Sequence, residues 1–308
     1  MDADDRALLA AGVGAALDPD ASAVTNDRVL RDLGWHDMLT TEPIDAVAVV
    51  FGELGRLAAR STVIDDVVGV ALGLPPGRAI VHPRWGGAEL PDPAGPAIDG
   101  VAGSRITTAA DADVLCRGGV ATVGTLDLEI VEREADRELG RVSWAGRPEA
   151  LAPLTDATID GAITAARLAL AHQLRGLASG MLTLARSHAL DRTQFGRPIG
   201  SFQAVRHRLA ETHVAIEGAT AALDAAVEDP AAITVDLARV LAGRAAIEAS
   251  RHCQQVLAGI GFTRDHDFHR YLFAAIELDG LYGTTTSLTR RLGRDLIATG
   301  VVPRTVEL

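Results

Sequence analysis

Two short stretches in the second half of the chain combine residue types that can meet the charge of phosphate groups. Residues 192–203 read RTQFGRPIGSFQ, and residues 255–263 read QVLAGIGFT. A guanidinium binds phosphate oxygens through parallel N–H donors, and glycine lets the backbone come close to a ligand. The first stretch also suits a helical corner in which Phe195 and Phe202 enter the core and Gly196 and Gly200 are turn residues. These two roles are compatible, and both stay open for this segment.

The elements that position these stretches follow from the apolar pattern. Apolar residues at three- and four-residue spacing are typical of amphipathic helices. Ser201 is the expected N-cap of the second such helix, which stops at Asp229-Pro230. The same pair fits the start of the next helix, since Asp accepts from free amides and Pro suits the first helical position. Four long helices with short connections predict an antiparallel bundle, and they are expected over residues 163–184, 201–229, 231–257 and about 266–297.

The first half of the chain has two different textures. The segment 44–74 is rich in apolar residues at mixed helical spacing, and the part 45–51 favours a helix over a buried strand. Prolines and glycines then separate short β-branched runs such as 79–81, and the run 123–131 alternates like a half-buried strand. We therefore expect a mainly α fold with a small β insert. Its parts are an N-terminal helical domain (1–75), a middle antiparallel β domain (76–150) and a C-terminal four-helix bundle (151–308).

Composition excludes several classes of function. The 308 residues are 48% hydrophobic and carry a formal net charge of -12, so a globular protein without a nucleic-acid partner is expected. Cys116 and Cys253 are the only cysteines and lie far apart, which argues against a disulfide framework or a cysteine-based metal site. No apolar run reaches the roughly 18 residues that span a membrane, and the acidic start is unlike a signal peptide. We expect a cytoplasmic protein with no bound metal.

On the two phosphate-type stretches, the chain resembles the acyl-CoA dehydrogenase family. Residues 192–203 are similar to its R-x-Q-F-G-x-P-I-x-x-F-Q signature, and residues 255–263 to its Q-x-x-G-G-x-G-F-T motif, with Ala258 in place of the first glycine. The resemblance implies the acyl-CoA dehydrogenase fold and FAD as the cofactor. It implies that residues of both motifs contact the adenosine diphosphate half of a FAD bound mainly by a neighbouring subunit, namely Arg192, Gln194, Phe195, Gln203, Gln255, Gly259 and Gly261.

The same resemblance implies that the catalytic base is missing. In the family, a glutamate removes the α-proton of an acyl thioester while flavin takes a hydride. Counting from Gln255 places the family's Y-E-G-T string on residues 281–284, where Tyr282 replaces the glutamate. Counting back from Arg192 places the alternative glutamate position on Ala166. A phenol with a reference pKa of about 10 is a poor base at neutral pH.

Two further features bear on the active site. Glu277 and Asp279 lie within a turn or two of Tyr282, but helical spacing predicts that they are solvated acids on another face. The family strand carrying Trp-Ile-Thr, which covers the flavin ring, has its nearest counterpart in residues 104–107, which read SRIT and lack the tryptophan.

The resemblance leads to three interpretations. In the first, the chain is the short subunit of a hetero-oligomeric acyl-CoA dehydrogenase, similar to the paired subunits of steroid degradation in actinobacteria. A longer partner then supplies the glutamate, the flavin-ring contacts and most of the acyl pocket, in a two-plus-two assembly. Electron-transfer flavoprotein is the implied electron acceptor. In the second, the chain acts alone with a relocated base such as Glu277 or Asp279. In the third, it is a structural homologue that binds no flavin.

Overall fold

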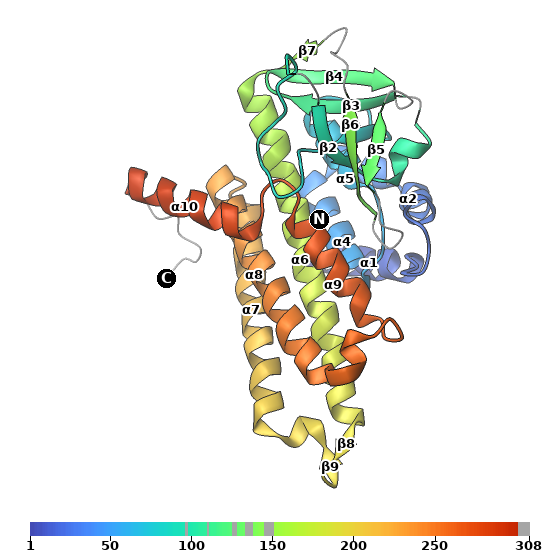
Figure 1. Cartoon of the computed structure of the whole chain (residues 1–308), viewed down its shortest axis with the longest axis vertical. Helices are drawn as coiled ribbons and strands as arrows, with labels where there is room; N and C mark the ends of the chain where they lie inside the picture. The colour runs from blue at the N-terminus through green and yellow to red at the C-terminus, as the bar shows by residue number, and fades with distance from the viewer. Residues whose placement is uncertain (96–97, 110, 125–127, 133–137, 145–150, 301–308) are drawn as a thin grey trace.

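The two ends of the chain form helices, and the middle part forms a small β region at one end of the molecule (Figure 1). The computed structural model describes residues 1–95, 98–109, 111–124, 128–132, 138–144 and 151–300. The longest helix, α6 (Asp156–Asp191), runs the length of the molecule and contacts both the N-terminal helices and the rest of the bundle. It is therefore the element that links the parts of the fold.

The N-terminal helices begin at residues suited to helix starts. The side chains of Asp2 and Ser22 accept backbone N–H bonds from Asp5 and Thr25, and Pro43 occupies the first turn of its helix. The predicted helix over 45–51 is confirmed. The five helices are α1 (Ala3–Ala16), α2 (Ala23–Asp32), α3 (Trp35–Thr41), α4 (Pro43–Leu57) and α5 (Ile64–Ala71).

The β region consists of two small sheets. One has the order β1-β3-β4-β7, the other β2-β6-β5, and a single bridge between His82 and Val101 joins them. All pairs are antiparallel except β1 with β3, whose long connection lets the chain re-enter in the same direction. The strands are β1 (Ala79–Val81), β2 (Ile98–Ala102), β3 (Asp111–Cys116), β4 (Gly119–Gly124), β5 (Glu129–Glu132), β6 (Gly140–Trp144) and β7 (Leu151–Pro153).

The single strand expected over 123–131 is divided between two strands. Val123 lies near the end of β4, and Glu129 begins β5 in the other sheet. Residues 125–127 of that expectation lie outside the described part of the chain.

The C-terminal bundle differs from the expectation in its last helix. Besides α6 it contains α7 (Gln203–Glu228), α8 (Ala232–Leu257), α9 (Phe268–Asp279) and α10 (Thr285–Thr299). The helix predicted over 266–297 is wrong, because it is broken between α9 and α10. Tyr282 and Gly283 have φ values of 53° and 101°, which a right-handed helix cannot include. The break turns α10 away from the bundle, where it packs on α8 (Figure 1).

Two predicted helix starts are also wrong. Ser201 lies in a 3-10 turn, η3 (Ile199–Ser201), and its hydroxyl donates to the carbonyl of Pro198, so Phe202 is the N-cap of α7. Asp229 ends α7 as predicted, but α8 starts after Ala231, with Pro230 outside the helix. The hydroxyl of Thr234 donates to the carbonyls of Asp229 and Ala231, which holds this connection without a capping carboxylate.

The N-terminal helices pack directly on the bundle through α4 and α6. Side chains at Gly55 and Gly176 would overlap the backbone of the opposite helix, so these glycines permit the close approach. A continuous apolar cluster covers this contact and extends to the break between α9 and α10; it includes Val50, Phe51, Leu54, Ala166, Leu170, Leu281 and Tyr282. The break is thus part of the core.

Candidate functional site

The first phosphate-type stretch forms an exposed hairpin at one end of the bundle. Strands β8 (Thr193–Gln194) and β9 (Arg197–Pro198) are joined by Phe195 and Gly196, with φ values of 53° and 78°. Positive φ at both positions is the geometry of a tight two-residue hairpin turn. The expected turn role of Gly196 is confirmed. The alternative that Phe195 enters the core is wrong, because the side chain is 91% exposed at the tip.

Aromatic and cationic groups are displayed around this tip. The rings of Phe195 and Phe202 meet edge to face at 6.1 Å, and the Arg197 guanidinium lies 4.3 Å from the centre of the Phe202 ring. Arg192 and Gln203 are exposed. The amide of Gln194 donates to the carbonyl of Thr193. A flat or anionic group from outside the chain can therefore reach a ring, a guanidinium and an amide together.

The second stretch follows α8 as the 3-10 turn η4 (Ala258–Phe262), at the same end of the bundle as the hairpin (Figure 1). Gln255 is exposed, and nothing lies within 4 Å of the place where a side chain at Gly259 would stand. Gly261 is buried, and a side chain there would press on Leu257 and the carbonyl of Gln254. Only part of this motif is therefore open to a ligand.

Ala258 departs from the motif at a position whose backbone conformation favours glycine. Its φ is 55°, a left-handed value at the end of α8 that costs glycine little and other residues more. The residue is exposed, so its methyl group lies at the surface and takes no part in the core.

The electrostatics of His188 agree with the closeness of the two stretches. Burial lowers the pKa of His188, and the charges of His266 and Arg192 lower it further. His266 follows the second stretch and Arg192 begins the first. Residues beside both stretches therefore influence the His188 imidazole. The structure thus brings Arg192, Gln203, Gln255 and Gly259 to one exposed end of the bundle.

Tyr282, at the family's glutamate position, is buried and hydrogen-bonded inside the chain. Its hydroxyl lies 2.8 Å from Nδ1 of His82, and Nε2 of His82 lies 2.8 Å from Oδ1 of Asp65. All three side chains are at most 2% exposed. Burial raises the pKa of Tyr282 well above its usual value, so the phenol stays protonated. His82 and Asp65 were not expected from the sequence, because 200 residues separate His82 from Tyr282.

The alternative glutamate position is equally closed. Ala166 is fully buried in the same apolar cluster as Tyr282. The next residue, Arg167, donates from Nε to the carbonyl of Tyr282 at 3.0 Å and from Nη1 to Asp236 at 3.0 Å. Burial, followed by the charges of Arg291 and Arg239, lowers the pKa of Arg167 to about 9. These contacts fix the backbone of the turn that carries Tyr282.

Glu277 and Asp279 are not solvated acids on an outer face, so that expectation is wrong. Glu277 is 7% exposed and accepts an N–H bond of 2.7 Å from Leu139. Asp279 accepts from the backbone N–H of Thr285 at 3.0 Å and pairs with the buried Arg239 at 3.4 Å. Helix α9 packs against α6 and α8, which buries this face.

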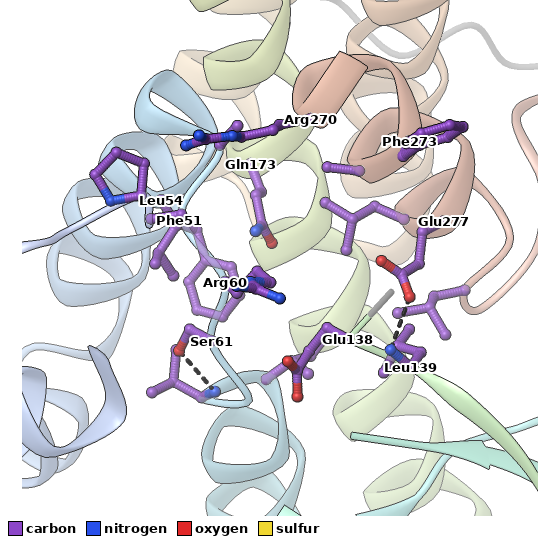
Figure 2. A pocket seen from close by; sticks show the side chains of 18 of the residues that line it. Phe51, Leu54, Arg60, Ser61, Glu138, Leu139, Gln173, Arg270, Phe273 and Glu277 are labelled. Atoms are coloured by element: carbon purple, nitrogen blue, oxygen red, sulfur yellow. Dashed lines mark hydrogen bonds between the residues drawn. The ribbon is translucent and has the colours of Figure 1, made fainter. Parts of the chain in front are cut away.

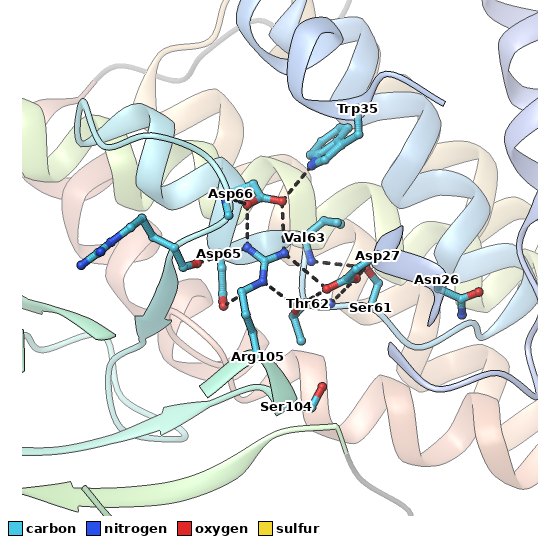
Figure 3. Close-up of polar contacts among 12 residues, drawn as sticks. Asn26, Asp27, Trp35, Ser61, Thr62, Val63, Asp65, Asp66, Ser104 and Arg105 are labelled. Atoms are coloured by element: carbon cyan, nitrogen blue, oxygen red, sulfur yellow. Dashed lines mark hydrogen bonds and ion pairs between the residues drawn. The ribbon is translucent and has the colours of Figure 1, made fainter. Parts of the chain in front are cut away.

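Residues 104–107 form the 3-10 turn η1 (Ser104–Thr107), and Arg105 points into the N-terminal helices (Figure 3). Its guanidinium donates to Asp66 at 2.6 Å and lies 3.3 Å from Asp27. Burial by itself raises the pKa of Asp66, but the hydrogen bond and charge of Arg105 outweigh it, and the pKa lies below its usual value. Arg105 therefore serves the junction between two parts of the fold and does not cover a flavin ring.

The turn before Tyr282 is covered from the β side. A side chain at Gly280 would overlap the indole of Trp85, and the N–H of Gly86 donates to the carbonyl of Gly280 at 2.8 Å. The residues around Tyr282 thus fit each other closely and do not fit an isoalloxazine ring. The bundle end, with its exposed donors and open glycine, fits the phosphate half of a dinucleotide.

A cavity of about 250 Å³ lies between α4, the start of α5, α6 and α9 (Figure 2). Glu277 lies on its wall, and Tyr282 does not. Its polar lining also includes Arg60 and Gln173, which no pattern in the sequence singled out.

The described residues hold neither a candidate metal site nor a candidate membrane span. These residues contain no group of three or more His, Cys, Asp and Glu side chains that could hold a metal ion. Within them, no helix is long and apolar enough to cross a membrane.

The class of the fold is defined by the order of its parts. N-terminal helices come first, a small β region follows, and the chain ends in a helical bundle with the buried Tyr282 turn and the exposed Phe195 tip. It is that of acyl-CoA dehydrogenases. Chains of the ChsE4–ChsE5 complex from Mycobacterium tuberculosis (TM-score 0.81, 22% identity) and of the Tcur3481–Tcur3483 steroid ACAD (TM-score 0.79, 24% identity) share it. The first likeness covers 99% of each chain, and the second covers 96% of this chain and 98% of the other.

Sequence similarity connects the C-terminal bundle with a known protein family. Residues 157–297 match the family described as acyl-CoA dehydrogenase, C-terminal domain. Acyl-CoA dehydrogenase IpdE2 of Mycolicibacterium smegmatis is 38% identical over 129 residues, which span 42% of this chain and 41% of that relative. Residues 157–297, in the C-terminal bundle, therefore match the acyl-CoA dehydrogenase family.

Proposed function

We propose that this chain is the non-catalytic subunit of a hetero-oligomeric, FAD-dependent acyl-CoA dehydrogenase. The observation that carries the proposal is the contrast within its own structure: the phosphate-type residues are exposed at the bundle end, whereas the base position is a buried tyrosine bound to His82. A longer partner supplies the glutamate.

The cofactor contacts belong to the bundle end. When bound, FAD would supply the acceptor for the hydride that leaves the β-carbon of the acyl group. Arg192 would neutralise phosphate charge, Gln203 and Gln255 would donate amide N–H groups, and the open backbone at Gly259 would allow close approach. Gln194, Phe195 and Gly261 complete the proposed set; Phe195 offers a ring, and Gly261 keeps the turn compact. The FAD so held sits mainly in the partner.

The chain contributes no proton acceptor of its own at the family positions. Dehydrogenation removes the α-proton to a base and the β-hydrogen with its electron pair to flavin, giving the enoyl-CoA. Tyr282 is protonated and its oxygen faces His82, and Ala166 has no ionisable group. The α-proton therefore goes to the partner's glutamate.

The assembly and the substrate follow from similarity. The likeness to chains of two-component acyl-CoA dehydrogenases supports a heteromer, for which we propose two copies of each subunit. One of those relatives is described as a steroid enzyme, so a steroid-derived acyl-CoA is the proposed substrate. Electron-transfer flavoprotein is the proposed acceptor, and the cytoplasm is the proposed location.

A second candidate, a self-sufficient enzyme, is favoured by one observation. Glu277 is buried at the wall of the cavity beside α6, as a relocated base would be. Against this, its Oε1 is held by the N–H of Leu139, and the surroundings of Tyr282 are filled.

Purification with and without the partner tests the proposal. We expect the chain alone to be colourless and inactive, and coexpression with a longer acyl-CoA dehydrogenase subunit to give a yellow complex that forms enoyl-CoA. A flavin-saturated chain that is active alone and loses activity as Glu277→Gln would establish the second candidate instead.

A further inference from the structure

The cavity between α4, α6 and α9 has no role in the function proposed above. Its volume of about 250 Å³ exceeds the roughly 150 Å³ that suffices to bind benzene in an engineered protein cavity. It therefore has room for a molecule of one or two rings. Most of its wall is apolar, formed by Phe51, Leu54, Val63, Ile64, Phe273 and Leu278.

Arg60 and Gln173 are two of the polar side chains that line the cavity. Figure 2 shows the Arg60 guanidinium and the Gln173 amide projecting into the cavity from opposite sides. Within the described part of the chain, neither side chain has a hydrogen bond or an ion pair. Both side chains are only partly buried, and an oxygen atom placed between them would accept hydrogen bonds from both.

The charges of the lining indicate whether the oxygen of a ligand is neutral or anionic. Three acidic side chains, Asp20, Glu138 and Glu277, face two basic ones, Arg60 and Arg270, so the lining carries one negative charge. Asp20 and Arg270 pair with each other at 2.6 Å. The interior then holds Arg60 with two carboxylates, which disfavours an anionic ligand.

We propose that this cavity binds an uncharged, mainly apolar ring compound through a carbonyl or hydroxyl oxygen held by Arg60 and Gln173. Such a ligand fills the apolar walls and gives both unpaired donors an acceptor, and it brings no charge near Glu277. The proposal is independent of flavin binding and of the partner subunit.

The test measures binding of matched probes to the full chain by calorimetry. The bicyclic ketone trans-1-decalone is the probe, decalin lacks the oxygen, and decalin-2-carboxylate carries a charge. We expect decalone to bind at least tenfold more tightly than either analogue. Arg60→Met and Gln173→Leu should each weaken decalone binding about tenfold, because each removes one hydrogen bond donated to the ketone oxygen. The exposed Arg31→Met variant is the matched control and should bind as the wild type does.

A cavity-filling variant keeps the test decisive if Arg60→Met does not fold. Ala274 lines the cavity, and Ala274→Phe should abolish decalone binding while Gln173→Leu only weakens it. Absence of binding by any probe, equal binding of decalone and decalin, or tighter binding of the carboxylate would each overturn the proposal.

Discussion

The turn around Tyr282 and the tip around Phe195 are both positive-φ turns next to bundle helices, yet their surroundings are opposite. The Tyr282 side chain is 1% exposed and hydrogen-bonded to His82, and its carbonyl accepts from Arg167. Phe195 is 91% exposed, and its ring meets Phe202 edge to face. Strained backbone persists where its surroundings hold it, and it is often kept for function. One turn is completed by its own chain, and the other presents its groups outward.

This contrast separates what the chain does for itself from what it offers to a partner. Residues near the first turn stabilise the fold, so their loss should change the free energy of unfolding. Residues at the tip should leave folding intact and change only assembly or cofactor retention.

Arg105 gives the largest expected effect on the folded side of the contrast. It is the cation among Asp27, Asp65 and Asp66, and Arg105→Met leaves their buried charges uncompensated. We expect the free energy of unfolding in urea to fall by about 3–5 kcal/mol. The exposed Arg31→Met variant should change it by no more than about 0.5 kcal/mol. Similar values for the two variants would show that the Arg105 network contributes little.

The same network predicts sensitivity to acid. The folded-state pKa of Asp66 lies below its unfolded value of 3.8, so its contribution is present above that pH and is lost as the pH falls through the folded pKa. His172 adds a second acid-sensitive group: burial, followed by the charges of Arg175 and Arg6, lowers its pKa from 6.5 to about 3. Between pH 6.5 and about pH 3, His172 is protonated in the unfolded chain and neutral in the folded chain. The free energy of unfolding therefore decreases as the pH is lowered, by up to about 1.4 kcal/mol per pH unit.

His172→Gln tests this slope. We expect urea unfolding at several pH values to show a weaker dependence between pH 6 and pH 4, and the exposed His213→Gln variant to keep the wild-type slope. If the slope survives in His172→Gln, the acid sensitivity has another source.

Tyr282→Phe should have an intermediate effect. It removes the hydroxyl from His82 and should lower the free energy of unfolding by about 1–2 kcal/mol. Turnover by the complex with the longer partner should not change. A large loss of rate with normal stability would make this hydroxyl catalytic.

Phe195→Ser should have the smallest effect on folding. Because the ring is exposed, the free energy of unfolding should change by less than about 0.5 kcal/mol. Phe51→Ala, in the core, should by contrast cost about 3–5 kcal/mol. A strongly destabilised Phe195→Ser chain would mean that the Phe195 ring stabilises the fold of this chain and is not an outward-facing group.

The tip was predictable because its residues are local. The strings at 192–203 and 255–263 carry their turn and helix-end signals within a dozen residues, and the helix ends predicted at 229 and 257 lie within one residue of the observed ends of α7 and α8. The break at 280–284 was missed, although Gly280 and Gly283 lie in it, because a lone glycine is tolerated inside a helix. Tertiary contacts, from Trp85 against Gly280 and Arg167 on the Tyr282 carbonyl, hold the backbone there together with the local bond from the Thr285 N–H to Asp279.

Long-range pairs were beyond the reach of local patterns. His82 meets Tyr282 across 200 residues, and Arg105 meets Asp27 across 78. Nor could spacing on one helix show that Glu277 is buried, because Leu139, its partner, comes from the β region.

The most direct test measures how much FAD the coexpressed complex retains when a residue of either turn is changed. With Arg192→Ala in this chain, we predict that FAD is retained about tenfold less tightly, since a charge-assisted contact to phosphate is lost. With Tyr282→Phe, we predict wild-type retention. A complex that keeps its flavin with Arg192→Ala and loses it with Tyr282→Phe would contradict the assignment of the cofactor to the bundle end.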